Sequence, residues 1–151
     1  MREALALARE AAEAGEVPVG CVVFDEAGEI IGRGRNRREE ARDACAHAEV
    51  EAIRAACAAR GSWNLSGCGL AVTLEPCPMC AGAMVMACLD RCYFGARDAR
   101  QGCCESVYAL PGDPAFYHRL PCVGGLMEEE AAALLRRFFQ ARRSTEEGGT
   151  P

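Results

Sequence analysis

The chain has 151 residues, of which 50% are hydrophobic and 26% are charged, and its formal net charge is -5. A chain of this length can bury a sizeable core as one domain, and the acidic balance disfavours a general nucleic-acid-binding protein, which is usually basic. All 17 basic residues are arginine, so chemistry that needs a lysine, such as Schiff-base catalysis or a Walker-type phosphate loop, is excluded.

The amino terminus and the cysteine usage indicate a soluble cytoplasmic protein. The stretch "MREALALAREAAEAGE" predicts an amphipathic helix with acidic residues, unlike the basic flank and apolar run of a signal peptide. No apolar run approaches the roughly 20 residues that a membrane span needs. The 11 cysteines are odd in number and irregularly spaced, which argues against a disulfide scaffold and for a reducing compartment.

A β-hairpin is predicted after the first helix. "VPVGCVVFD", at 17–25, predicts a buried strand, and "EIIGRGRN", at 29–36, predicts a second strand beyond a short turn. Residues 44–60 are rich in helix formers and carry an apolar stripe, which predicts a helix that Gly61 ends.

The second half of the chain continues the alternation of strands and helices. "GLAVTLE", at 69–75, predicts a third strand, and Pro76 is expected to begin a helix that runs to about Cys88. The remaining elements are a fourth strand at "RCYFGA", a short fifth strand around "LPCVGG", and a final helix from Met127 to about Arg143.

Helices that alternate with strands predict an α/β fold. We expect a three-layer α/β/α sandwich with a mixed five-stranded sheet, formed by a single domain over residues 1–143. The final stretch "STEEGGTP", at 144–151, has too little apolar surface to fold and is predicted to be a disordered polar tail. The starts of helices that follow strands converge at one rim of such a sheet, where open α/β domains bind ligands.

The residues that carry chemistry are His47 and Glu49 in "AHAE" and Cys77 and Cys80 in "EPCPMC". Cysteines three residues apart lie on one face of a helix, within reach of a single ion, and two thiolates with one imidazole form a donor set suited to zinc. Three protein ligands leave a fourth position open for water, as in catalytic zinc sites. Glu49 can serve that site as a proton carrier only if the helix begins close to His47, because residues two apart in a helix interior lie about 200° apart around the axis.

Other interpretations of the same cysteines stay open at this point. Cys77 and Cys80 alone also fit a redox pair of the C-x-x-C type. A structural four-cysteine metal site would need a second pair, and Cys88 with Cys92 is the nearest one in the sequence.

The cysteines outside these pairs carry less information. Most of them lie among Ala, Val and Leu, where cysteine acts as a small buried apolar group. This interpretation covers Cys21, Cys45, Cys57, Cys68, Cys88, Cys92 and Cys122. The adjacent Cys103 and Cys104 stay unassigned.

The sequence resembles the zinc-dependent cytidine deaminase superfamily, and within it the bacterial tRNA-specific adenosine deaminases. The segments "VPVGCVV", "GRGRNR", "AHAE", "TLEPCPMCAGAM", "FGARDAR" and "LLRRFFQARR" occur in the order and approximate spacing of that family, over about residues 16–143. The resemblance implies a cytidine deaminase-like fold and one zinc ion per subunit, held by His47, Cys77 and Cys80, with Glu49 as the proton shuttle.

The resemblance also implies a substrate and a partner. The expected reaction is the hydrolysis of adenosine to inosine at the wobble position of an arginine tRNA, with release of ammonia, by a homodimer that binds the anticodon arm. A base in a single-stranded loop can be splayed out more easily than a base inside a duplex. In the family, the nucleoside pocket is formed by the residues that match Asn36, Val17, Pro18, Ala48 and Leu74. Contacts with the anticodon loop are expected at Asp98, Phe139, Arg142 and Arg143.

Two departures from the family pattern fall in the segment expected to meet the RNA. Glu105 stands where a small residue is typical, and Tyr117 stands where Asn is usual.

Two other functions stay open. One is deamination of a free nucleobase or nucleoside, of the guanine or cytidine type, because "EPCPMC" also occurs in guanine deaminases. The other is a non-catalytic zinc or thiol module that binds nucleic acid.

Overall fold

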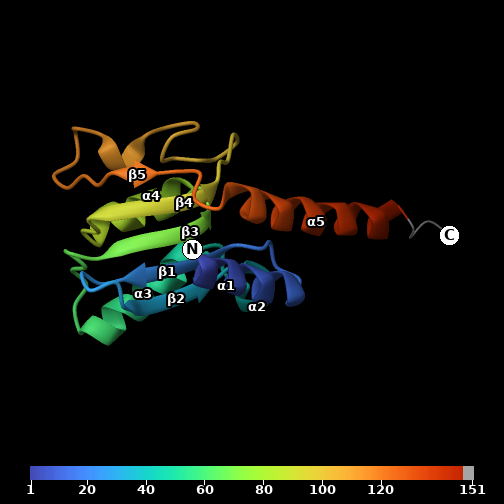
Figure 1. Ribbon diagram of the computed structural model, residues 1–151, viewed down its shortest axis with the longest axis horizontal. Coiled ribbons are helices and arrows are strands. Elements are labelled where there is room, and N and C mark those ends of the chain that lie inside the picture. Colours follow the sequence, from blue (N-terminus) through green and yellow to red (C-terminus); the bar gives the residue numbers. More distant parts are fainter. Residues whose placement is uncertain (148–151) are drawn as a thin grey trace.

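The computed structural model describes residues 1–147 and has a five-stranded sheet in the order β2-β1-β3-β4-β5 (Figure 1). The strands are β1 (Gly20–Phe24), β2 (Ile30–Arg35), β3 (Gly69–Leu74), β4 (Arg91–Ala96) and β5 (Cys122–Val123). β1 pairs antiparallel with both β2 and β3, whereas β3, β4 and β5 run parallel to one another. The predicted mixed sheet and its opening hairpin are thereby confirmed.

Helices cover both faces of the sheet, as the three-layer prediction required. α1 (Arg2–Glu13) and α5 (Glu128–Glu147) pack on one face, and α3 (Ala48–Arg60) and α4 (Pro78–Met86) pack on the other (Figure 1). Two short elements were not predicted from the sequence: α2 (Arg38–Ala41) and a 3₁₀ turn at Leu110–Gly112.

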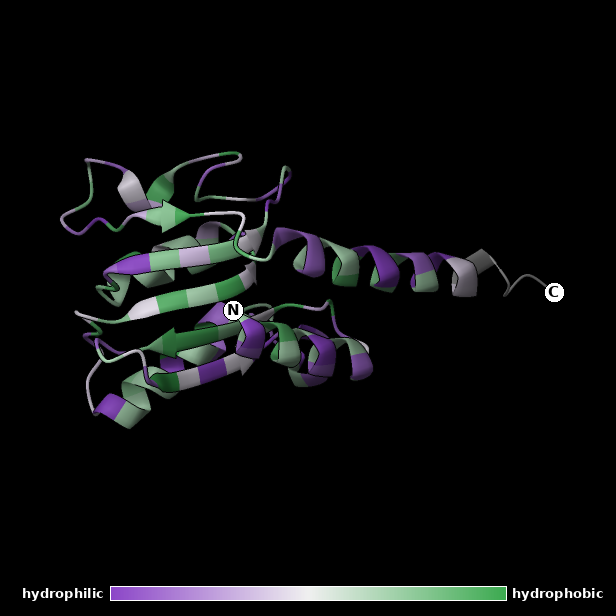
Figure 2. Ribbon diagram, in the orientation of Figure 1, coloured by the Kyte–Doolittle hydropathy of each residue, from purple (hydrophilic) through white to green (hydrophobic). Residues whose placement is uncertain are grey.

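Apolar side chains fill both interfaces between the layers. The larger cluster joins the sheet to α3 and α4, and Leu70, Val72, Met84 and Phe94 are fully buried in it. A smaller cluster lies under α1 and α5. Figure 2 shows the hydrophobic strands β1 and β3 between these layers, and the mixed hydrophilic and hydrophobic surface of α5. None of the helices within residues 1–147 combines the length and apolar composition needed to cross a membrane.

The glycine of "GRGR" at position 34 allows α3 to lie directly on β2. A Cβ atom at Gly34 would lie 2.2 Å from the carbonyl oxygen of Ala48, a distance that real Cβ atoms do not reach. Gly32 has the same relationship to Ala52, one turn further along the helix. The two glycines therefore fix the position of the helix whose first turn carries Glu49.

The starts of two helices differ from the predicted ones. α3 begins at Ala48 rather than Ala44, because the Asp43 side chain accepts the amide of Cys45 at 2.8 Å and holds the preceding residues in a turn. α4 begins at Pro78 rather than Pro76. The residue before a proline is pushed away from helical geometry, so Cys77, with ψ of 175°, stays extended.

The final helix is longer than predicted. α5 continues through Glu147, so residues 144–147, predicted as the start of a disordered tail, are helical. The hydroxyl groups of Ser144 and Thr145 donate to the carbonyl oxygens of Gln140 and Ala141, at 3.1 and 3.0 Å, which accommodates polar side chains within the helix. The rest of the predicted tail, residues 148–151, lies outside the described residues.

Candidate active site

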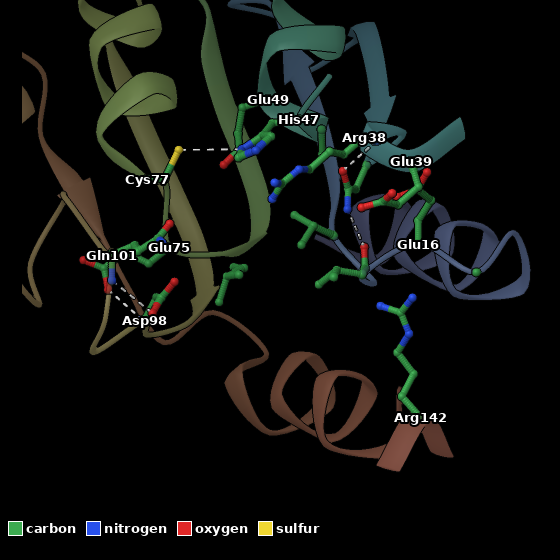
Figure 3. Close-up of a pocket in the computed structure, with 16 residues that line it drawn as sticks. Glu16, Arg38, Glu39, His47, Glu49, Glu75, Cys77, Asp98, Gln101 and Arg142 are labelled. Carbon is green, nitrogen blue, oxygen red and sulfur yellow. Dashed lines mark hydrogen bonds between the residues drawn. The ribbon is translucent and has the colours of Figure 1, made fainter. Parts of the chain in front are cut away.

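The three candidate metal ligands meet at the sheet rim where two helices begin. His47 is the N-cap of α3, and Cys77 is the N-cap of α4, with Cys80 in its first turn. The Nδ1 atom of His47 lies 3.6 Å from the Sγ atom of Cys77 and 3.6 Å from that of Cys80. Figure 3 shows the His47 ring directed at the Cys77 sulfur. Neither Cys88 nor Cys92 belongs to this group of ligand atoms, so the proposed four-cysteine arrangement does not form in the described chain.

The three groups share protons with one another. A hydrogen bond from the Cys80 thiol, assisted by one from His47, lowers the pKa of Cys77 to about 4. The hydrogen bond to the Cys77 sulfur in turn raises the pKa of His47, and the neighbouring Cys77 thiolate together with burial raises the pKa of Cys80. A metal ion would take the place of the shared protons, since cysteine binds metals as the thiolate. Two sulfurs and one imidazole nitrogen fit zinc.

Glu49 lies one residue into α3, beside this group, and is only 4% exposed. Burial raises its pKa to about 7, and the Cys77 thiolate adds to the shift. Because α3 begins at Ala48, Glu49 is in the first turn of the helix, and both His47 and Glu49 line the same pocket (Figure 3). Helix α3 therefore begins close to His47, as the pairing of His47 with Glu49 requires.

Most of the predicted substrate-binding residues line this pocket. They are Val17, Asn36, Ala48, Leu74, Asp98 and Arg142, together with His47, Glu49 and Cys77. Arg142 reaches toward the pocket from α5 (Figure 3). Pro18 is fully buried and does not line it, which departs from the expectation, because the side chain packs into the interior. Phe139 and Arg143 line a second groove. It shares Val17, Leu74, Asp98 and Gln101 with the pocket.

Asn36 shapes the wall of the pocket through the backbone. Its side-chain nitrogen donates to the carbonyl oxygen of Val17 at 3.3 Å, and its side-chain oxygen accepts the amide of Arg38 at 3.2 Å. The residue is 8% exposed. The Asn36 amide thus links the segment before β1 to the segment after β2 while facing the pocket.

Glu75 is an important residue that the sequence analysis missed. It is 2% exposed, and its carboxylate accepts the amides of Asp98 at 3.0 Å, Cys104 at 3.2 Å, Glu105 at 2.7 Å and Ser106 at 2.8 Å. Burial alone would raise the pKa of Glu75, but these bonds and the Ser106 hydroxyl lower it. An acidic residue directly after a buried strand was the only signal available in the sequence.

Glu105, one of the two departures from the family pattern, forms specific contacts. Its carboxylate pairs with Arg97 at 3.1 Å and accepts the amide of Gly124 at 3.2 Å. Arg97 also pairs with Glu128 at the start of α5, at 3.1 Å. The charge of Arg97 is therefore balanced within the protein. Tyr117, the second departure, is 75% exposed.

Most of the cysteines that were interpreted as buried apolar groups are buried in the structure. Cys21, Cys68, Cys88 and Cys92 are buried, as are the unassigned Cys103 and Cys104. Cys57 and Cys122 are half-buried, and Cys45 is exposed, because it lies in the turn that Asp43 forms before α3. No disulfide joins them within residues 1–147.

A mixed sheet between two helical layers, with a histidine, two cysteines and a buried glutamate at the starts of two helices, defines the class of zinc-dependent deaminases. Residues 1–96 match the family described as the cytidine and deoxycytidylate deaminase zinc-binding region. The chain is 44% identical, over 95% of its length and 88% of the relative's, to the tRNA-specific adenosine deaminase of Bacillus subtilis (strain 168). The chain therefore belongs to this zinc-binding deaminase family, in the group of the tRNA-specific adenosine deaminases, and zinc is its cofactor.

Solved structures agree with this assignment. A structure from work on A-to-I editing by tRNA:A34 deaminases has a TM-score of 0.85 and 44% identity, over 89% of this chain and 97% of that one. The guanine deaminase of Nitrosomonas europaea has a TM-score of 0.74 and 28% identity, over 89% of this chain and 80% of that one. Both comparisons bear out the cytidine deaminase-like fold.

Proposed function

We propose that the protein is a hydrolase that deaminates adenosine to inosine at the wobble position of a tRNA. The observation that carries this proposal is the pocket in which buried Glu49 lies beside His47 and Cys77, and which adjoins an arginine-lined groove. The relatives with 44% identity over 95% of the chain carry the name tRNA-specific adenosine deaminase, and this likeness supports the choice of substrate.

His47, Cys77 and Cys80 would hold the zinc ion. When bound, zinc supplies a Lewis acid that makes a water molecule acidic enough to react near neutral pH. Glu49, whose pKa is about 7, exists in both protonation states near that pH. It can accept a proton from the attacking water and deliver one to the departing amine. Water adds at C6 of adenine, the C6–N bond breaks, and ammonia and inosine result.

The pocket walls would orient the base. Val17 and Leu74 would supply apolar contacts, and Ala48, the first residue of α3, lines the same pocket. The Asn36 side chain has one amide hydrogen beyond its bond to Val17, which is available to the nucleoside. Asp98 lies at the junction between pocket and groove, where the nucleotides next to the target would leave the pocket.

The neighbouring groove supports a single-stranded RNA as the substrate. It is lined by Arg100, Arg136 and Arg143 and by the aromatic ring of Phe139, which is 42% exposed. Arginines can contact phosphates despite the acidic net charge, because phosphate binding depends on local contacts. An exposed ring offers a surface on which an unpaired base can stack. We assign the anticodon loop of an arginine tRNA to this groove.

An assay of ammonia release tests the substrate class. The zinc-loaded protein is expected to release ammonia from an arginine tRNA anticodon stem-loop with adenosine at the wobble position, and to leave free adenosine, cytidine and guanine unchanged. A matched stem-loop with guanosine at that position is the control and is expected to be inert. Turnover of a free base or nucleoside without turnover of the adenosine stem-loop would overturn the proposal.

Guanine deamination is the second candidate function, favoured by the structural likeness to the guanine deaminase. The lower identity of that structure, 28% against 44%, and the arginines of the groove make it the weaker candidate. The same ammonia assay separates the two. A non-catalytic zinc or thiol module would show no ammonia release from any of these compounds.

Assembly and location follow from the same proposal. A homodimer would cover exposed apolar side chains such as Met86 on α4, Tyr108 and Tyr117, which are 63%, 69% and 75% exposed. Light scattering on the purified protein should give twice the mass of the chain, and the mass of one chain would contradict the dimer.

A tRNA substrate would be met in the cytoplasm, which is therefore the expected location of the enzyme.

A further inference from the structure

A second group of sulfur atoms lies at the β4–β5 edge of the sheet. Cys92 is in β4, Cys122 is in β5, and Cys104 is in the loop 97–121 that joins the two strands. Their Sγ atoms all lie within 4.8 Å of one another. Within residues 1–147, only this group and that of His47, Cys77 and Cys80 bring metal-ligating side chains together in this way. None of the three lines the active-site pocket.

The backbone sets this convergence. The parallel register of β4 and β5 places Cys92 directly opposite Cys122, and the amide of Cys92 donates to the carbonyl oxygen of Pro121 at 3.0 Å. The amide of Cys104 is held by the Glu75 carboxylate at 3.2 Å. Hydrogen bonds of the backbone amides therefore hold the three segments in place. The three sulfur atoms come together as a result of these backbone contacts.

Three sulfurs without nitrogen or oxygen donors form a soft ligand set. Metal–thiolate distances are about 2.3 Å, so an ion at the centre of three sulfurs needs them about 4 Å apart, which lies within the observed limit. Cys92 and Cys104 are buried, at 0% and 6% exposure, whereas Cys122 is half-buried. Of the three cysteines, only Cys122 is partly exposed to solvent.

We propose that Cys92, Cys104 and Cys122 form a second metal site for a soft, thiophilic cation, with copper(I) as the ion that fits best. Structural zinc sites use four protein ligands, and this group contains three. Copper(I) accepts three sulfur ligands, and its binding would release the thiol protons to solvent. The proposal does not depend on the identity of the nucleic-acid substrate.

A bound ion would tie the loop 97–121 to the sheet. The loop supplies Asp98 and Gln101 to the active-site pocket, and the amide of its Cys103 donates to the carbonyl oxygen of Pro76 at 2.8 Å. An ion at Cys104 would therefore hold the same loop at a second point, next to the segment that carries Cys77. The expected consequence is a less mobile pocket wall.

Copper(I) uptake by the zinc-loaded protein tests the site. Under anaerobic, reducing conditions, the metal is supplied from a coloured copper(I)–chelator complex, and copper and zinc are both counted by elemental analysis. The wild-type protein should take up one copper(I) per chain and keep its zinc. Cys104→Ser and Cys122→Ser should keep zinc but take up no copper(I) at the same free concentration. Cys45→Ser, which removes an exposed thiol outside both groups, should behave as wild type.

Two results would overturn the proposal. One is a wild-type protein that takes up no copper(I), or takes it up only as zinc is lost. The other is equal uptake by wild type and by Cys122→Ser. Hydrogen exchange adds a readout that non-specific thiol binding would not change: copper(I) should slow exchange of amides in the loop 97–121 in wild type and have no effect there in Cys122→Ser.

Discussion

The Nδ1 atom of His47 lies 3.6 Å from the Sγ atom of Cys77, although 30 residues separate them in the chain. Each residue is the N-cap of a helix, and both helices begin at the same rim of the sheet. The positive ends of two helices thus lie beside the ligand group, where they favour the thiolate form of Cys77. The ligand geometry depends on the positions of these two helix starts.

Replacement of one ligand should remove zinc. Cys77→Ala is expected to be purified with almost no zinc and no deaminase activity, because two remaining ligands leave the ion weakly held. Cys45→Ala, at an exposed cysteine, should retain about one zinc per chain. The measurement is elemental analysis of both proteins after dialysis against a weak chelator. Full zinc content in Cys77→Ala would contradict the assignment of this ligand.

A methyl group at Gly34 should disturb the start of α3. Because a Cβ atom there would lie 2.2 Å from the carbonyl oxygen of Ala48, Gly34→Ala is expected to lower the free energy of unfolding by about 3 kcal/mol and to weaken zinc binding. Gly82→Ala, on α4 with no atom within 4 Å of the new Cβ, should be neutral or slightly stabilising. Urea denaturation checks both, and equal effects of the two substitutions would argue against close packing at Gly34.

Glu75 should contribute stability that depends on pH. Its pKa is lowered in the folded protein, so its contribution is complete above the unfolded-state value of about 4.3 and is lost as pH falls through the folded-state pKa. Glu75→Gln is expected to cost about 1–3 kcal/mol at neutral pH, and this difference should shrink toward zero in acid. Urea denaturation of both proteins at several pH values gives the result; a pH-independent difference would mean that the charge of Glu75 is not involved.

An arginine of the groove should act on RNA binding alone. Arg143→Ala is expected to raise KM for the anticodon stem-loop, leave kcat nearly unchanged, and reduce the dependence of binding on salt by about one phosphate contact. Arg54→Ala, on the solvent side of α3 where it pairs with Glu51, is the matched control and should change neither value. A fall in kcat with unchanged KM for Arg143→Ala would place the residue in the chemistry instead.

The fold and the ligand group could be predicted from the sequence because their signals are local. Strand patterns, helix formers and the spacing of Cys77 and Cys80 are properties of short segments. The helix starts were misplaced by two to four residues, since single hydrogen bonds, such as that from Cys45 to the Asp43 carboxylate, decide them.

Long-range contacts could not be predicted in the same way. Glu75 reads as a strand-end acid, and only the return of the chain past β4 brings four amides to its carboxylate. In the sequence, Cys92 and Cys122 were interpreted as separate buried apolar groups and Cys104 was left unassigned. The three converge because the β4–β5 register places Cys92 opposite Cys122 and the connecting loop brings in Cys104. The role of Glu105 likewise could not be predicted, because it depends on the ion pair with Arg97.

The proton transfer by Glu49 is the central claim, and one comparison tests it most directly. Glu49→Gln removes the proton carrier with little change in volume, while Glu51→Gln, on the same helix but outside the pocket, is the control. Ammonia release from the anticodon stem-loop should fall at least about 100-fold in Glu49→Gln with zinc retained, and stay near wild type in Glu51→Gln. Near-wild-type turnover by zinc-loaded Glu49→Gln would contradict the mechanism.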